Sequence, residues 1–119
     1  MRYVKPEEKE WLQRKGYSKK VLLSTEEIKP EGHVVQMVRS KSHTQIAPHF
    51  HKETTEIYHI LQGSATLLIE DREFQAGPRE TYLCEPGDIH GVINDTDEDF
   101  LILVFKINMK EDDLYWAQT

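Results

Sequence analysis

From residue 33 onward, short runs of apolar and β-branched residues follow one another, and a turn signal closes each run. Runs of this kind predict strands, and breaks such as Gly77-Pro78 and Pro86-Gly87 predict tight turns. The predicted strands are 33–40, 46–51, 56–61, 65–69, 73–75, 81–84, 89–93 and 100–107. Many short strands without helices between them favour an all-β fold, either a sandwich or an antiparallel barrel.

Residues 1–30 carry a different pattern. Pro6 followed by acidic residues predicts a short helix that continues to Leu12 and ends near Gly16. Trp11 and Leu12 would anchor this helix to the rest of the domain. The apolar run 21–23 predicts an edge strand or a segment that packs on a partner subunit.

These patterns divide the chain into two parts. We expect residues 1–30 to form an N-terminal extension that packs on the barrel or on a partner. Residues 31–119 would form one barrel domain with a short C-terminal tail, in which 111–116 predicts a helical turn.

Composition narrows the class of protein. The 119 residues carry a net charge of −6 without a basic stripe, which argues against nucleic acid as a partner. The longest apolar run, 100–105, is far too short to span a bilayer, and the N-terminus lacks the apolar core of a signal peptide. We therefore expect a cytoplasmic protein. The single cysteine, Cys84, cannot form an internal disulfide and is expected to be a small core residue.

Four side chains along these strands have the types and spacing of a metal site. His49 and His51 are two residues apart, so on a strand both point to one face. The turn-like segment 52–55 lets Glu56 return on the next antiparallel strand and face the same way. His90 begins a strand just after the Pro86-Gly87 turn, where its side chain can project into a barrel mouth.

Imidazoles and a carboxylate suit one divalent transition metal per chain: Fe, Mn, Ni, Co, Zn or Cu. Four protein ligands on an octahedral ion leave two positions for water, substrate or dioxygen, which is typical of a catalytic site. Taken alone, a His-x-His pair is usually an ordinary exposed or core pair. His59 has the wrong parity and is left out, and Glu53 could replace Glu56 only if the His51 strand continued.

With these residues the chain resembles the cupin superfamily of small β-barrels. The first cupin motif contains His-x-His, three or four residues, Glu, six residues and Gly, and this chain has His49-x-His51, Glu56 and Gly63 at those spacings. The second motif ends in Gly, two residues, His, three residues and Asn, matched here by Gly87, His90 and Asn94. The resemblance covers about residues 33–107. It implies a double-stranded antiparallel barrel with His49, His51, Glu56 and His90 as the metal ligands.

The departures from the family pattern lie in turns. His43 stands where the first motif begins with Gly, and Arg79 stands at the leading Gly of the second. Glu85 holds the proline position of the second motif, with the proline shifted to Pro86. These changes concern local backbone and leave the ligand positions filled.

Strand parity predicts the pocket wall. Tyr58 and Ile60 share the parity of Glu56, and Val92 shares that of His90, so all should point inward. Lys106 is expected to face water, which would turn three apolar neighbours inward, Leu101, Leu103 and Phe105. Three further residues have an uncertain facing: Gln36, Met37 and Tyr82. Arg39 is the one nearby cation, and an ordinary solvated strand arginine is its simpler interpretation.

Two functions remain open. The first is a metal-dependent enzyme acting on a small oxygen-chelating substrate, with Tyr58 as a proton donor; the family includes dioxygenases, decarboxylases and isomerases. The second is a non-enzymatic module that binds or senses a small ligand, with a scaffold role as a third. The lack of an expected inward base other than Glu56 favours the second, whereas open metal positions favour the first. A homodimer is the expected assembly.

Overall fold

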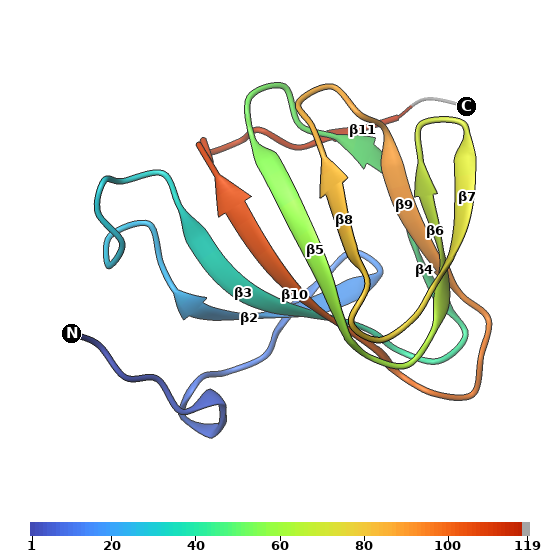
Figure 1. Ribbon diagram of the computed structural model, residues 1–119, viewed down its shortest axis with the longest axis horizontal. Helices are drawn as coiled ribbons and strands as arrows, with labels where there is room; N and C mark the ends of the chain where they lie inside the picture. The colour runs from blue at the N-terminus through green and yellow to red at the C-terminus, as the bar shows by residue number, and fades with distance from the viewer. Residues whose placement is uncertain (118–119) are drawn as a thin grey trace.

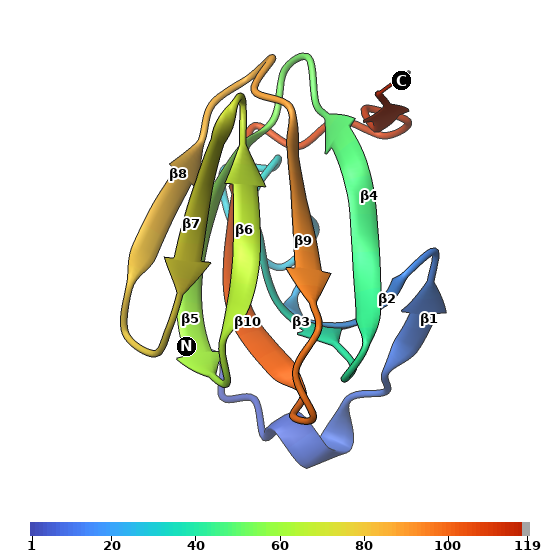
Figure 2. The same cartoon turned by 90° about the vertical axis from the view of Figure 1, so that its right-hand side faces the viewer.

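The computed structural model describes residues 1–117, which form two antiparallel sheets facing each other (Figures 1 and 2). One sheet has six strands in the order β1-β2-β3-β10-β5-β8, and the other has five in the order β11-β4-β9-β6-β7. The strands are β1 Leu12–Arg14, β2 Tyr17–Leu23, β3 Val34–Ser40, β4 Thr44–Phe50, β5 Thr55–Gln62, β6 Ala65–Ile69, β7 Arg72–Ala76, β8 Thr81–Cys84, β9 His90–Asn94, β10 Phe100–Ile107 and β11 Tyr115–Trp116. The predicted all-β antiparallel fold is confirmed, with jelly-roll-like topology.

The core lies between the two sheets. Alternate residues of each strand turn inward, as in β3, where every second residue from Val34 to Ser40 is buried. The largest fully buried apolar side chains are Phe100, Ile60, Leu67, Ile102 and Val104. Cys84 is 1% exposed in this core, as expected, and burial raises the pKa of its thiol. The apolar interior fills one end of the barrel and leaves a pocket toward the other.

The N-terminal helix prediction is wrong beyond its first turn. A 3₁₀ turn spans Pro6–Glu8, and the chain then forms a hairpin of β1 and β2 around Gly16, whose φ is +81°. Segment 21–23 belongs to β2 and pairs with β3 on one side, whereas the partners of β1 are residues 17–19 of β2, so 21–23 lies at an edge of the sheet, as one of the two predicted alternatives held. Pairing with β3 supplies hydrogen bonds and apolar contacts that a short isolated helix lacks.

Trp11 does serve as an anchor. The guanidinium of Arg39 lies 4.2 Å from the centre of its ring, and the ammonium of Lys20 lies 4.9 Å from it. Such cation–π contacts hold the segment before β1 to the outside of the six-stranded sheet. Arg39 thus lies outside the barrel, but it packs on Trp11 with its Nε buried, and it is not the solvated arginine of the simpler interpretation.

The C-terminal tail also differs from expectation. Instead of a helical turn, Tyr115 and Trp116 form the short strand β11, which pairs with Phe50 and His49 of β4. Tyr115 stacks on Phe50 with ring centres 5.3 Å apart. The tail therefore covers the end of the strand that carries the His-x-His pair.

Two motif departures keep the backbone that glycine would allow. His43 has a φ of 57° and Arg79 a φ of 73°, both in the left-handed region. The imidazole of His43 is 2.7 Å from the carboxylate of Asp97 at this turn. Local backbone is thus preserved at both positions although the glycines are gone.

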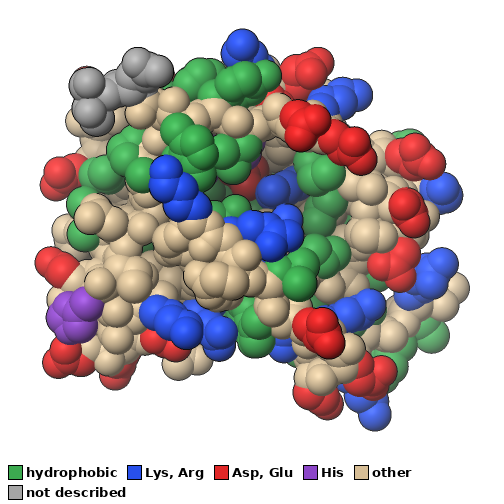
Figure 3. Space-filling model, turned by 180° about the vertical axis from the view of Figure 1, so that it is seen from behind, with side chains coloured by type: hydrophobic (Ala, Val, Ile, Leu, Met, Phe, Trp, Pro, Cys, Tyr) green, Lys and Arg blue, Asp and Glu red, His purple; other side chains and the backbone are tan. Residues whose placement is uncertain are grey.

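The surface adds two observations. Seen from behind, the molecule is hollowed near its middle, with basic and apolar side chains around the hollow (Figure 3). Among the described residues, no helix has the length and apolarity needed to cross a membrane.

Candidate metal centre

Two neighbouring strands of the five-stranded sheet position the imidazoles. β4 pairs with β9 so that His49 lies opposite His90, and the register shifts between Ile46 and His49. Gly91 makes this close approach possible, because a Cβ there would lie 2.8 Å from the carbonyl oxygen of Ile46. His51 follows the end of β4, and all three imidazoles are buried.

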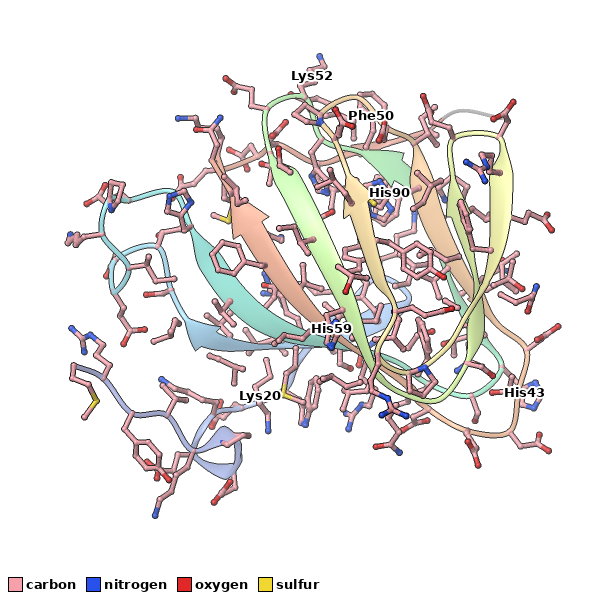
Figure 4. All side chains as sticks on the ribbon, in the orientation of Figure 1. Lys20, His43, Phe50, Lys52, His59 and His90 are labelled. Carbon is pink, nitrogen blue, oxygen red and sulfur yellow. The ribbon has the colours of Figure 1, made fainter. Side chains whose placement is uncertain are left out.

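Glu56 arrives from the opposite sheet. The chain turns at 52–54 and enters β5, whose residue Glu56 is 4% exposed and faces the histidines. The carboxylate does return on the next strand, as expected, but that strand lies in the facing sheet, so Glu56 points toward the histidines from the other side of the pocket. Figure 4 shows His90 between the two sheets, with His43 well away from it.

The four side chains form one compact group. The donor atoms of His49, His51, Glu56 and His90 all lie within 4.8 Å of one another. Glu56 Oε1 is 2.9 Å from His51 Nε2 and 3.0 Å from His90 Nε2. These four residues could hold a metal ion, which agrees with the sequence prediction for this cluster.

Hydrogen bonds fix which nitrogen of each ring faces the group. Nδ1 of His49 is 2.8 Å from the carbonyl of Ala47, and Nδ1 of His90 is 2.9 Å from that of Asp88. Nδ1 of His51 contacts the carbonyl of Asp113 in the same way. Because a carbonyl only accepts, each Nδ1 must donate, and each neutral ring then presents the lone pair of Nε2 to the centre. Histidines that ligate metals are oriented by such bonds.

The donor set passes a direct test of fit. Ligand atoms about 2.1 Å from one ion and at right angles around it lie about 3 Å apart, which matches the spacing of Glu56 Oε1 from two imidazole nitrogens. In neutral rings these contacts would set lone pair against lone pair. His51 Nε2 is buried and makes no hydrogen bond of acceptable geometry, although Glu56 is near. An ion among these atoms would satisfy all of them.

The electrostatics keep the donor atoms ready for a cation. Burial and the neighbouring His90 lower the pKa of His49 to about 4, so this imidazole is neutral at pH 7. Burial raises the pKa of Glu56, but the imidazoles of His51 and His90 beside its carboxylate outweigh burial and hold that pKa well below its usual value. Burial alone would lower the pKa of His51. The neighbouring Glu56 carboxylate has the larger effect, so the net change is a raised pKa. The site therefore holds an ionised carboxylate at neutral pH.

The cluster lies in the wall of a pocket. The pocket has a volume of about 460 Å³ with its open mouth included, and the cavity inside it measures about 40 Å³. The apolar part of the wall consists of Val38, Ile46, Val92, Ile102, Val104 and Leu114. This narrow shape suits a small or flat molecule.

One wall prediction is wrong. On β10 the inward residues are Phe100, Ile102, Val104 and Lys106, and Lys106 lines the pocket. The three residues expected to point inward, Leu101, Leu103 and Phe105, lie on the other face of the strand, and Phe105 is 38% exposed. The structure therefore also contradicts the expectation that no lysine points inward beside Glu56.

The other residues predicted for the pocket wall fall into two groups, those that line the pocket or core and those that face away. Tyr58 and Val92 line the pocket as expected, Ile60 is buried in the core, and Gln36 also lines the pocket. The Tyr58 hydroxyl donates to Glu56 Oε1 at 3.3 Å. Met37 faces away with the half-buried side of β3, and Tyr82 packs on Phe74 outside the pocket.

The residues left out of the site lie away from it. His59 Nδ1 is 2.9 Å from the Thr81 hydroxyl on the outer side of β5 and β8. Glu53 is exposed. Asp88 accepts from the backbone N–H of Glu85 at 2.9 Å, which closes the turn that contains Pro86 and Gly87.

Asp113 is a positioning residue that the sequence reasoning missed. Its carboxylate accepts from the backbone N–H groups of Lys52, Glu53 and Thr54 at 2.8–3.0 Å and from the Thr54 hydroxyl at 2.9 Å. Its carbonyl accepts from His51. Asp113 thus holds the turn that joins two ligand-bearing segments, from a distance along the chain that no local spacing signals.

Comparison with known proteins places this geometry in a family. The model of the cupin domain matches residues 36–106. No curated protein matches the chain significantly.

Several solved structures share the fold at low identity. KdgF from Halomonas sp. superposes with a TM-score of 0.81 at 17% identity, covering 94% of this chain and 97% of that one. The polyketide cyclase RemF from Streptomyces resistomycificus gives 0.84 at 21% identity, over 100% of this chain and 87% of that one. A predicted oxalate decarboxylase from Thermotoga maritima gives 0.80 at 18%, over 91% and 100%. At these identities the likeness concerns the fold.

Proposed function

Because the chain belongs to the cupin family, whose domain model spans residues 36–106, we propose that it is a metal-dependent enzyme acting on a small organic substrate with chelating oxygens. The reaction would be of the dioxygenase, decarboxylase or isomerase type. The observation that carries the proposal is the buried group of four donors, all within 4.8 Å of one another in the wall of a pocket.

In this proposal His49, His51, Glu56 and His90 hold the ion. A bound divalent ion would supply Lewis-acid polarisation of the substrate. Four protein ligands would leave positions open on an octahedral ion, and all four residues line the pocket. Carbonyl acceptors behind the three rings keep them oriented, so that binding needs little reorganisation.

Tyr58 is the proposed proton donor. Burial and the Glu56 carboxylate raise the pKa of Tyr58 well above its usual value, so the phenol keeps its proton at neutral pH. Its ring lies edge-on to His90 with centres 5.9 Å apart, which places the hydroxyl beside the ligand group. The apolar wall limits water around this proton.

The structural neighbours support an enzymatic function at the level of class. Proteins that share the fold include a polyketide cyclase, a predicted oxalate decarboxylase and a sugar phosphate isomerase. We propose from these that this barrel carries chemistry on a small oxygenated molecule. A phosphorylated sugar fits poorly, because Lys106 is the one cation among the residues that line the pocket in the described chain.

A non-enzymatic binding module is the second candidate. One observation favours it: among the described pocket-lining residues Glu56 is the one carboxylate, and it belongs to the ligand group. A carboxylate held by two imidazoles is a poor general base. A binding module would retain one small molecule tightly without converting it.

Metal loading followed by turnover assays separates the two candidates. The purified chain would be loaded with Fe(II), Mn(II) or Ni(II) without oxygen, and dioxygen uptake and product formation would be followed with diketones, catechols and 2-oxo acids. We expect one ion per chain and turnover of at least one class. One ion per chain without turnover, together with a tightly retained small molecule, would support the binding module. A homodimer and a cytoplasmic location stay predictions, and native mass measurement tests the first.

A further inference from the structure

Lys106 places a cation inside the pocket that the metal site does not require. It lies opposite Glu56 in the β10–β5 pairing, on the inward face that also carries Ile102 and Val104. Its side chain is 16% exposed, and its stem lies along the apolar wall. Placing an ammonium there has a desolvation cost that an exposed lysine avoids.

Glu56 uses little of the hydrogen-bonding capacity of this ammonium. Nζ of Lys106 is 4.0 Å from Glu56 Oε2, which is beyond hydrogen-bond distance. Glu56 Oε1 is the oxygen that faces His51 and His90. In the described part of the chain, no other carboxylate lies within ion-pair distance of Lys106, so its N–H donors remain available toward the pocket.

The charge balance of the pocket favours an anion. Three neutral imidazoles, one carboxylate and one ammonium around a divalent ion leave a net positive charge, although the whole chain carries −6. A charge in a narrow pocket with apolar walls is weakly screened and attracts its counterion strongly. The remaining polar wall groups, those of Tyr17, Gln36 and Tyr58, are uncharged donors or acceptors.

We propose that Lys106 binds an anionic oxygen of the substrate, a carboxylate or an enolate, while the metal takes a neighbouring oxygen. This inference rests on the proposed metal site and narrows its substrate class from small oxygenated molecules to small organic anions. The short apolar wall would hold the rest of a compact or flat substrate. Lys106 thereby decides specificity, by its charge and by its position beside the ligand group.

A purely structural role for Lys106 makes a different prediction. If the ammonium served only to orient Glu56, its removal would weaken metal binding and would treat charged and neutral ligands alike. If the ammonium binds substrate, its removal weakens the binding of anionic ligands selectively and changes metal affinity little. The two roles therefore separate in a pair of ligands that differ in charge alone.

The test uses the Co(II)-loaded chain with pyruvate and its uncharged counterpart pyruvamide. Bound cobalt is counted first by elemental analysis, and each ligand is then titrated while the visible cobalt bands are recorded. The proteins are the wild type, Lys106→Met, Lys106→Arg and the exposed control Lys110→Met. Methionine keeps an unbranched side chain only one atom shorter than that of lysine and removes the charge.

We expect Lys106→Met to bind pyruvate about tenfold more weakly or worse, with pyruvamide affinity and cobalt content unchanged. Lys106→Arg should recover most of the preference, and Lys110→Met should match the wild type. Equal pyruvate affinity in the wild type and Lys106→Met, or no pyruvate binding by the cobalt-loaded wild type, would overturn the inference and leave the metal site standing. A wild-type chain that takes up no metal would overturn the proposed function itself and the inference with it.

Discussion

The two sheets bring different chemistry to the same pocket. The five-stranded sheet supplies the imidazoles, with His49 and His90 on paired strands and His51 just beyond β4. The six-stranded sheet supplies Glu56 and Lys106 from the paired strands β5 and β10. Its polar uncharged groups are those of Tyr17, Gln36 and Tyr58. The wall formed by the five-stranded sheet thus carries the imidazoles. The wall formed by the six-stranded sheet carries the charged groups and the phenolic hydroxyls.

This division suggests how one barrel can serve many reactions. The imidazole wall is held by backbone carbonyls and by close strand pairing, so its geometry changes little with the surrounding sequence. The opposite wall depends on individual side chains, and a single substitution there alters charge or proton supply. We expect the first wall to determine metal binding and the second to determine which molecule binds and reacts.

Loss of His90 is expected to have the largest effect. His90→Ala removes one ligand and leaves Glu56 without one of its two imidazole contacts, so metal affinity should fall about a hundredfold or more. Elemental analysis after dialysis against limiting metal would measure it. His59→Ala, on the outer side of β5, is the control and should retain the wild-type metal content. Unchanged metal in a folded His90→Ala protein would refute the ligand assignment.

The metal cluster was predictable because it depends on short-range rules. The spacing of two between His49 and His51 sets their common face on any strand, and the turn after His51 brings Glu56 back toward them from the facing sheet. His90 required knowledge of a family pattern, since its approach to His49 spans a long stretch of chain. The four predicted residues do lie together.

The charged wall was not predictable, for a reason visible in β10. The six residues from Phe100 to Phe105 are all apolar, so alternation carries no information about which face is inward. The assumption that Lys106 faces water then exchanged the predicted inward and outward residues of this strand. In the structure Phe100 and Val104 are buried, and Lys106 shares their parity.

The predictions for the two ends of the chain were wrong for a different physical reason. The segment before Gly16 has local helix signals, yet it forms β1, because β2 is held by β3 and offers β1 a partner. Similarly, Trp116 lies in a strand, β11, because the adjacent strand β4 offers it a pairing partner. Tertiary pairing overrides weak local preference in short segments, which no pattern within them reveals.

Asp113 links the two walls and should give an intermediate effect. In Asp113→Asn one carboxylate oxygen becomes an amide donor that faces backbone N–H groups of the 52–54 turn. We expect unfolding free energy to fall by about 2 kcal/mol, because buried donors lose their acceptor. Metal affinity should fall about tenfold, because His51 and Glu56 flank this turn.

Denaturant unfolding and metal titration would measure the two effects of Asp113→Asn. Asp112→Asn alters the exposed neighbour and should change neither quantity. If Asp113→Asn lowers stability while metal affinity stays at the wild-type value, the turn does not position the ligands, and the two walls are assembled independently of it.

Tyr58→Phe should have the smallest effect on metal and tests the division most sharply. The hydroxyl donates to Glu56 over a long 3.3 Å, so its loss should change metal affinity by less than about threefold. As the proposed proton donor, however, Tyr58 should be needed for turnover, which should fall about a hundredfold or more. Tyr82→Phe removes an equivalent hydroxyl, which bonds Glu80 outside the pocket, and should leave both quantities unchanged. A Tyr58→Phe protein that loses metal as His90→Ala does would show that the phenol supports the ligand group. The proposed separation between a metal-binding wall and a reacting wall would then fail at Tyr58.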